Sequence, residues 1–299
     1  MRSFKKLSLV AAALMASTAM VQAADLIQQA PTHDLPPEVV PSAAATGWYI
    51  RGDIGYSALD YDADTRFLQG GTFGGVIDDG DIDETFYLQG GIGYQVTDYF
   101  RVDATLGYHN DTDTFGFSRN IASVPAPGLV ACINAPAGGT PECLFTDEQE
   151  FDATVLLANA YVDLGTVNGI TPYVGAGIGG AHVSYGNLSN TQTCSVAAPT
   201  DPSCVDLTDI HQGEDQWRFA YAFHAGASFD INCRLKADAG YTFTRIEGGE
   251  AFEFPDGSGL LGTQGFDQGI DIHTGRVGLR YALSDAGCHS APQPQVVYK

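Results

Sequence analysis

The sequence predicts an all-β protein: an eight-stranded, antiparallel, up-and-down transmembrane β-barrel with four long extracellular loops. Three observations predict this fold. Stretches in which apolar and polar residues alternate recur along the chain, and the joins between them are short and long in turn. Beyond residue 23, no run of 18 consecutive apolar residues could form a membrane-spanning helix. In a bilayer, only helices and closed β-barrels pair every backbone amide, so a mature chain without such a helix would have to cross the membrane as a closed barrel.

The joins between the predicted strands differ strongly in length. The short ones are residues 97–98, 165–170 and 231–232, and the long ones are about residues 58–84, 110–150, 186–215 and 247–269. Bacterial membrane barrels have this asymmetry, with tight turns in the periplasm and long loops outside the cell. Four loops of this length are uncommon in a compact soluble domain. This disfavours the alternative of a soluble, lipocalin-like periplasmic barrel. Such a barrel would also need polar residues on its outer face.

Two terminal segments flank the predicted barrel, which covers residues 47–283. Residues 1–23 combine Arg2, Lys5 and Lys6 with an apolar run and end in Val21-Gln22-Ala23, as in a cleaved export signal. Residues 24–46 are rich in Pro and Ala without periodicity and predict a flexible periplasmic lead-in. Residues 284–299 form a periplasmic C-terminal tail.

The first four strands are expected within residues 48–57, 85–96, 100–108 and 151–164. Side chains alternate between the two faces of a strand, so one face should contact lipid and the other the lumen. The outward residues are, in order, Trp48, Ile50, Ile54 and Tyr56; Phe86, Leu88, Ile92 and Tyr94; Phe100, Val102, Ala104, Leu106 and Tyr108; and Leu156, Ala158, Ala160 and Val162. If the pairing register of a strand shifted by one residue, its charged side chains would point toward the lipid.

The last four strands are expected within residues 171–185, 216–230, 233–245 and 270–283. Their outward residues are Val174, Ala176 and Ile178; Phe219, Tyr221, Phe223, Ala225 and Phe229; Leu235, Ala237, Ala239, Tyr241 and Phe243; and Val277, Leu279 and Tyr281. The inward glycines 175, 177 and 179 leave room for larger neighbours. Eight strands are an even number, as closure of such a barrel requires.

Charged residues gather on the predicted inward face. Seven cations and five carboxylates fall there: Arg51, Arg101, Arg218, Arg234, Lys236, Arg276 and Arg280, with Asp53, Asp103, Asp163, Asp230 and Asp238. The lumen of an eight-stranded barrel is just wide enough for side chains to fill it. These groups should therefore form a paired polar plug, which argues against a general porin.

Six cysteines in an exported chain predict disulfides, and 15 connectivities are possible. Two pairs lie each within one long loop, and the last two cysteines lie at the same end of neighbouring strands. We therefore predict the pairs Cys132 with Cys143, Cys194 with Cys204, and Cys233 with Cys288. No Cys or His spacing typical of a zinc site occurs, so neither a metal nor another cofactor is expected.

The chain is acidic overall. Its net charge of −22 becomes −25 after removal of the signal, which carries three cations and no anion. Nucleic-acid binding depends on basic residues that neutralise phosphates, so a nucleic-acid partner is not expected.

Three segments carry a family resemblance: GWYIRGDIGYS, TPYVGAGIGGAHVSYGN and GRVGLRYAL. They resemble the small outer-membrane barrel proteins of alphaproteobacteria, the porin-family surface antigens, which are related in fold to the membrane domain of OmpA and to opacity proteins. The resemblance implies the outer membrane of a Gram-negative bacterium, contact with its lipid and lipopolysaccharide, and assembly by the barrel assembly machinery. Barrels of this family usually stop at a terminal aromatic residue, whereas here a tail follows Leu283.

The favoured function is that of a structural barrel that maintains the envelope and displays acidic loops to host or environmental ligands; no enzymatic activity is expected. One alternative is a narrow channel for small solutes, gated by the inward charges. The other is an enzyme that modifies lipid A, because His182 and Ser184 share an outward face and Glu214 or Asp215 begins the next strand.

Overall fold

The computed structural model describes residues 46–61, 65–69, 72–121, 142–192, 207–253 and 263–284, all within one compact unit. The predicted signal, most of the lead-in and nearly all of the tail lie outside these residues. The described part of the chain contains no helix long and apolar enough to cross a membrane.

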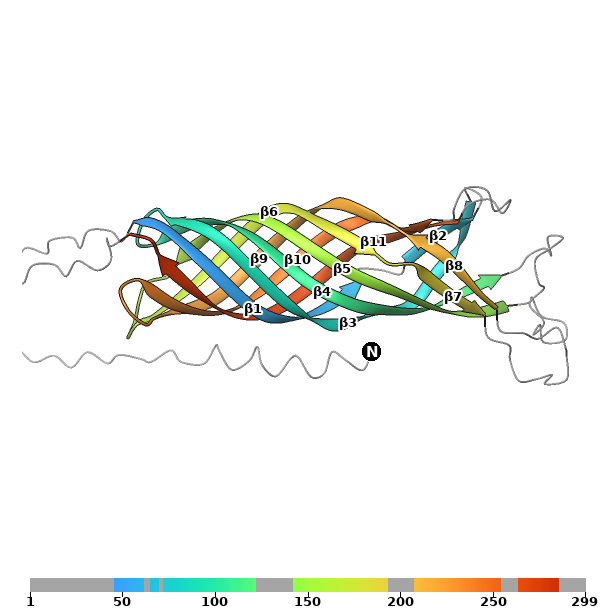
Figure 1. Ribbon diagram of the computed structural model, residues 1–299, viewed down its shortest axis with the longest axis horizontal. Coiled ribbons are helices and arrows are strands. Elements are labelled where there is room, and N and C mark those ends of the chain that lie inside the picture. The colour runs from blue at the N-terminus through green and yellow to red at the C-terminus, as the bar shows by residue number, and fades with distance from the viewer. Residues whose placement is uncertain are drawn as a thin grey trace, which may run out of the picture. The chain divides into compact units, whose positions relative to one another are not determined.

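Eight strands close into a ring, as predicted (Figure 1). They are β1 (Gly47–Tyr61), β3 (Thr72–Gln95), β4 (Phe100–Ile121), β5 (Glu142–Asp163), β6 (Ile170–Tyr185), β9 (Asp215–Asp230), β10 (Leu235–Glu253) and β11 (Thr263–Ala282). Each pairs antiparallel with the next, and β11 pairs back with β1 from Tyr49 opposite Ala282 to Tyr61 opposite Ile270. The closed ring leaves no unpaired edge.

The predicted inward and outward faces are confirmed. On β4, Arg101, Asp103 and Thr105 are buried in the lumen, whereas Leu106 is 54% exposed on the outer wall. The same division holds for Arg51 against Ile50 on β1. Because the side-chain period of a strand is two, assigning one apolar face from the sequence also assigns the opposite face.

Three short strands extend the barrel within segments that were expected to be loops. They are β2 (Thr65–Gln69), β7 (Leu188–Gln192) and β8 (Leu207–Gly213). β2 pairs with β3 and β11, β7 with β5, and β8 with β7 and β10. A second ring therefore stands on the first, with β2 in place of β1, and β7 and β8 in place of β6 and β9.

The prediction of loops over residues 58–84, 110–150, 186–215 and 247–269 was thus wrong over much of their length. A strand needs about 9–11 residues to cross a bilayer, and β3 has 24. Beyond the apolar region the outward positions become polar, so the alternation that marks a strand in the sequence fades although the backbone ladder continues. This loss of contrast explains the error.

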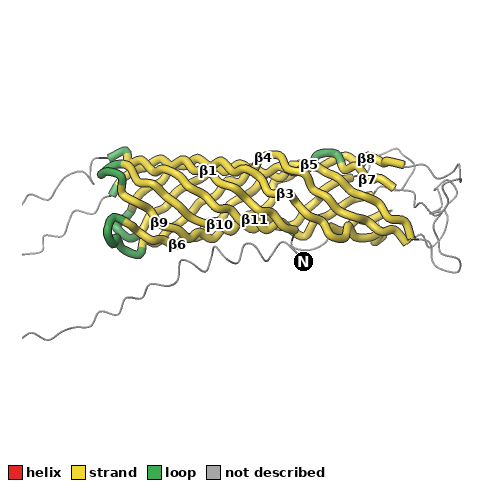
Figure 2. Tube along the Cα trace, turned by 90° about the horizontal axis from the view of Figure 1, so that it is seen from below, coloured by secondary structure: helices red, strands yellow, loops and turns green. Residues whose placement is uncertain are grey.

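The three short joins lie together at one end of the barrel, which we call the turn end (Figure 2). They are residues 96–99, 164–169 and 231–234, and β1 begins and β11 ends beside them. Hydrogen bonds close the turns, such as Val96 N to Phe100 O at 2.9 Å and Ile231 N to Leu235 O at 3.0 Å. We call the opposite end the loop end.

The interior also contains a large apolar cluster that the sequence analysis missed. Its members are Leu59, Ile82, Phe151, Ala153, Val155, Leu157, Ala181, Val183, Tyr185, Leu188, Ala220, Ala222, Ile246, Ala251, Phe252, Ile270 and Ile272. These residues occupy inward positions toward the loop-end part of the strands. The lumen is therefore filled by a polar and an apolar zone, rather than by a polar plug alone.

Candidate functional site: the filled lumen

Two arginines and two aspartates form the centre of the polar zone. Arg51 donates from Nε and Nη2 to the two carboxylate oxygens of Asp53, at 2.9 Å each, and from Nη1 to Asp103 at 3.0 Å. Arg276 Nη1 donates to Asp53 Oδ1 at 2.7 Å. All four side chains are at most 2% exposed. Strand alternation predicts an inward position for each of them, and their placement in the lumen brings them together.

Neutral side chains complete the hydrogen bonding of this cluster. Gln89 Nε2 donates to Asp53 at 3.0 Å, and Asp103 accepts from Tyr49 Oη at 3.0 Å and from Asn159 Nδ2 at 2.8 Å. Buried ion pairs repay their desolvation only when the remaining polar atoms also find partners. These additional donors meet that condition.

Arg101 is held in a different way. Its Nε donates to Asp163 at 3.1 Å, while its guanidinium carbon lies 4.2 Å from the ring centroid of Tyr161 and 4.6 Å from that of Tyr173. Among the described residues, its two terminal nitrogens have no hydrogen-bond partner. The faces of the two rings attract the cation instead.

The inward glycines do make room for larger neighbours, as predicted. A Cβ atom at Gly175 would collide with the ring of Tyr161, and one at Gly177 with the amide oxygen of Asn159. Both neighbours belong to the polar network. The small residues of β6 therefore position the large polar residues of β5.

Two predicted pairs lie at or near the turn end. Arg280 Nη2 donates to Ser228 at 2.9 Å, and its Nε lies 3.6 Å from Asp238. Lys236 and Asp230 pair at 2.6 Å with both side chains more than one-third exposed, so they belong to the rim.

Arg234 is not part of the buried plug. It precedes β10, and its Nη1 donates to the hydroxyl of outward-facing Tyr281 at 3.3 Å. Its side chain therefore lies at the rim of the lumen rather than in the buried plug, because strand alternation does not fix a side chain that lies in a turn. It does line the cavity at the turn end that is described below.

Arg218 belongs to a separate cluster toward the loop end. Its Nη1 donates to Asp267 at 2.6 Å, and Tyr185 Oη donates to the same carboxylate at 3.0 Å. Asp267 was not among the predicted members, because it lies in a segment that was expected to be a loop. The need of a buried arginine for a carboxylate was the one signal that could have suggested it.

The outer wall changes character along the strands. Exposed apolar residues cover it toward the turn end, and carboxylates take over the outward positions on seven of the eight strands toward the loop end. We call these carboxylates the acidic belt: Asp60, Asp83, Glu84, Asp111, Asp113, Glu148, Glu150, Asp152, Asp215, Glu247, Glu250 and Asp271. An apolar band bordered by polar residues is the pattern of a surface that crosses a bilayer.

His182 and Ser184 lie on this outer wall, between β5 and β9. Ser184 stands opposite Asp152 on one side and Asp215 on the other, and His182 stands opposite Trp217, whose ring lies 5.3 Å away edge-on. In the described part of the chain, no hydrogen bond joins His182 to Ser184. A serine nucleophile would need that contact with its base.

The predicted disulfide pairs lie mainly outside the described residues. Cys233 is disulfide-bonded. The side chains of the other five cysteines are not among those described, so the three pairings stay predictions.

A closed eight-stranded ring, an apolar outer band and a filled lumen define a small transmembrane β-barrel of the bacterial outer membrane. Comparison of the sequence with known families agrees. Residues 9–282 match the family described as outer membrane protein beta-barrel domain, and the chain belongs to this family. Its location is accordingly the Gram-negative outer membrane, with the turn end in the periplasm and the loop end outside the cell.

Similar proteins occur in Brucella. An uncharacterized protein of Brucella melitensis biotype 1 is 36% identical over 290 residues, covering 90% of this chain and 94% of the relative. One of Brucella abortus strain 2308 is 36% identical over 296 residues with the same coverage. Among solved structures, the chain resembles OprG from Pseudomonas aeruginosa (14% identity, 80% and 99% of the two chains, TM-score 0.44) and neisserial surface protein A (14%, 79% and 97%, TM-score 0.36).

Proposed function

We propose that this protein is a non-conducting, non-enzymatic structural barrel that strengthens the outer membrane and presents acidic loops to ligands outside the cell. The filled lumen carries the proposal. The ion-pair cluster around Asp53 and the apolar cluster around Ile272 occupy the interior with buried side chains. Because side chains fill the interior of the barrel, its outer wall and its loop end are the surfaces through which it can contact lipid and ligands.

The second ring supports a role in display. The strands continue beyond the apolar band. The segments that join β4 to β5 and β7 to β8 therefore start from the second ring rather than from the bilayer surface. The carboxylates of the predicted loops lie mainly in the strands below these segments, in the acidic belt, where they favour basic or cation-bridged partners. The partners we propose here are host or environmental ligands.

The acidic belt supports lipopolysaccharide as a second partner. The belt follows the apolar band toward the outside, where the phosphates of the outer leaflet lie. Carboxylates and phosphates repel each other unless a divalent cation bridges them, and Mg²⁺ and Ca²⁺ prefer oxygen ligands. We propose that such bridges hold the barrel in the leaflet. Insertion by the barrel assembly machinery would then use Tyr281, the last outward aromatic residue of β11.

A deletion strain tests the proposal. We expect greater sensitivity to EDTA and detergent and lower adhesion, both restored by the wild-type gene. A second complementing gene, in which a Gly/Ser linker replaces residues 122–141 and Cys143, the predicted partner of Cys132, is changed to Ser, keeps the barrel strands and should restore envelope resistance but not adhesion. Wild-type envelope resistance and adhesion in the deletion strain would contradict the proposal.

The lipid A-modifying alternative is supported only by the closeness of His182 and Ser184 on the outer wall. Its test is the mass spectrum of lipid A from cells that overproduce the protein or its Ser184→Ala variant. We expect identical spectra. Loss of an acyl chain that depends on Ser184 would favour the enzyme.

A further inference from the structure

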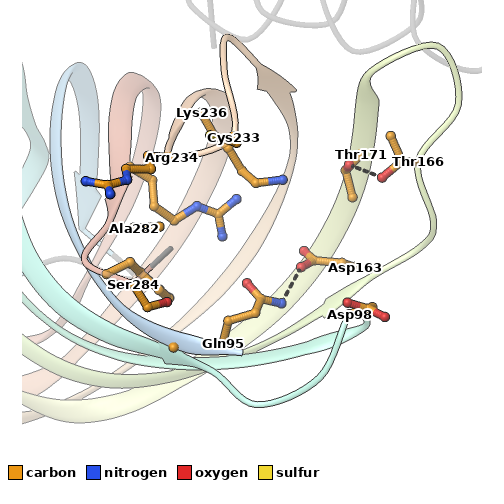
Figure 3. Close-up of a pocket in the computed structure, with 13 residues that line it drawn as sticks. Gln95, Asp98, Asp163, Thr166, Thr171, Cys233, Arg234, Lys236, Ala282 and Ser284 are labelled. Atoms are coloured by element: carbon orange, nitrogen blue, oxygen red, sulfur yellow. Dashed lines mark hydrogen bonds between the residues drawn. The ribbon is translucent and has the colours of Figure 1, made fainter. Parts of the chain in front are cut away.

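A cavity of about 250 Å³ opens at the turn end of the lumen (Figure 3). Its walls come from β1, β3, β5, β6, β10 and β11 and from the turns between them. This volume is smaller than that of a pocket for a drug-sized ligand, so it suits a group with the size of an amino acid. The proposed structural function does not use this cavity.

The two sides of the cavity carry opposite charges. Arg234, Lys236 and Arg280 come from the β10 and β11 side, where Lys236 also pairs with Asp230 at 2.6 Å. Asp98, from the turn after β3, and Asp163, from the end of β5, line the opposite side, and Figure 3 shows them across the opening from Arg234 and Lys236. A group that carries both a carboxylate and an ammonium would meet the opposite charge on each side.

Arg280 adds a buried donor to the cationic side. The residue is 5% exposed, and its Nη1 has no hydrogen-bond partner among the described residues. A buried guanidinium donor without an acceptor is costly. A ligand carboxylate in the cavity would supply the acceptor, and arginine matches carboxylate geometry well.

Further polar groups line the opening. The hydroxyls of Thr166 and Thr171 hydrogen-bond to each other at 2.6 Å, and Gln95 Nε2 donates to Asp163 at 3.3 Å. These groups are neutral, and Asp163 shares its charge with Arg101, whose Nε lies 3.1 Å away. The arrangement favours a small, doubly charged ligand over an apolar one.

We propose that this cavity binds the zwitterionic head of an α-amino acid, with the carboxylate toward Lys236 and Arg280 and the ammonium toward Asp98 and Asp163. Free amino acids and the stem peptides of the cell wall both present this group in the periplasm, which the turn end faces. The shared chemistry defines the site, and the experiment separates the two sources.

The test uses the full-length mature barrel, folded in detergent micelles and labelled for amide NMR. Alanine is compared with propionate and ethylamine, which each carry one half of its charge. We expect saturable shifts of the Thr166, Thr171 and Ser284 amides with alanine, and at least tenfold weaker binding of the other two, because each lacks a charged contact. A stem peptide that ends in meso-diaminopimelate is titrated in parallel, and the tighter binder of the two identifies the source.

Two exposed substitutions and one control complete the test. Lys236→Gln should weaken alanine binding about tenfold, and Asp98→Asn should abolish the preference for alanine over propionate. Arg245→Gln, on the outer wall of β10, should change neither. Equal binding of the three small probes, absence of saturable shifts, or insensitivity to both substitutions would overturn the proposal.

Discussion

Arg276 on β11 and Asp53 on β1 form an ion pair of 2.7 Å across the seam where the last strand meets the first. The two residues are 223 positions apart in the chain. Asp53 also accepts two hydrogen bonds from Arg51, so one carboxylate contacts two buried guanidinium groups, and Arg51 pairs in addition with Asp103. The seam is therefore closed by side chains as well as by the backbone ladder between Tyr49 and Tyr61 of β1 and its partners on β11.

Removing the charge of Asp53 should destabilise the barrel strongly. Asp53→Asn leaves Arg51 and Arg276 close together in the lumen with one carboxylate fewer, and breaking a buried pair costs about 3–5 kcal/mol. Urea unfolding of the barrel in detergent measures the change. The matched control is Asp230→Asn, in the exposed pair with Lys236, with an expected cost of about 0–1 kcal/mol. Equal effects would show that the seam cluster has no special role.

A methyl group on the inner wall should be tolerated far less than one on the outer wall. At Gly93 an added Cβ would meet the ring of Tyr49, whereas at Gly52 it would meet nothing within 4 Å. We expect Gly93→Ala to cost about 1–3 kcal/mol by overpacking, and Gly52→Ala less than about 0.5 kcal/mol. The temperature at which the folded band disappears on an unboiled gel reports both. A larger loss for Gly52→Ala would contradict the observed faces.

The barrel should not conduct ions. Ile246, Ile270 and Ile272 are fully buried in the apolar cluster, and water-filled lumens belong to barrels with more strands. We expect planar-bilayer recordings of the purified protein to show no reproducible current steps. Regular steps that Asp53→Asn alters would revive the channel alternative.

Divalent cations should stabilise the barrel in lipopolysaccharide but not in phosphatidylcholine. EDTA removes the bridges that we propose between the acidic belt and phosphates, so the thermal midpoint should fall in lipopolysaccharide vesicles, by about 2–4 °C for each kcal/mol lost. Glu148→Gln combined with Glu150→Gln and Asp152→Asn should reduce this fall. An equal fall in both kinds of vesicle would point to a different role for the cation.

A non-reducing peptide map tests the three predicted disulfides. We expect Cys132 linked to Cys143, Cys194 to Cys204, and Cys233 to Cys288, and a mature chain that begins at Ala24 after removal of the signal. Linkage between the two cysteine-containing loops would contradict the assigned pairs.

The sequence by itself determined the ring of eight strands, its faces and the location of the protein. Alternation on β4, from Arg101 to Tyr108, is enough to assign a lipid face and a lumen face, because every second side chain points the same way. The short turns and the export signal then orient the barrel. None of these inferences needs a contact between distant residues.

Only the tertiary structure decided which inward residues meet and where the barrel ends. Arg218 pairs with Asp267, Arg234 contacts outward-facing Tyr281, and β2, β7 and β8 extend the ring past the apolar band. The physical reason is that alternation assigns a side chain to a face of the barrel wall but not to a position along the barrel axis. That position depends on the stagger between neighbouring strands. Outside the bilayer, where the outer wall is polar, even the faces lose their contrast in the sequence.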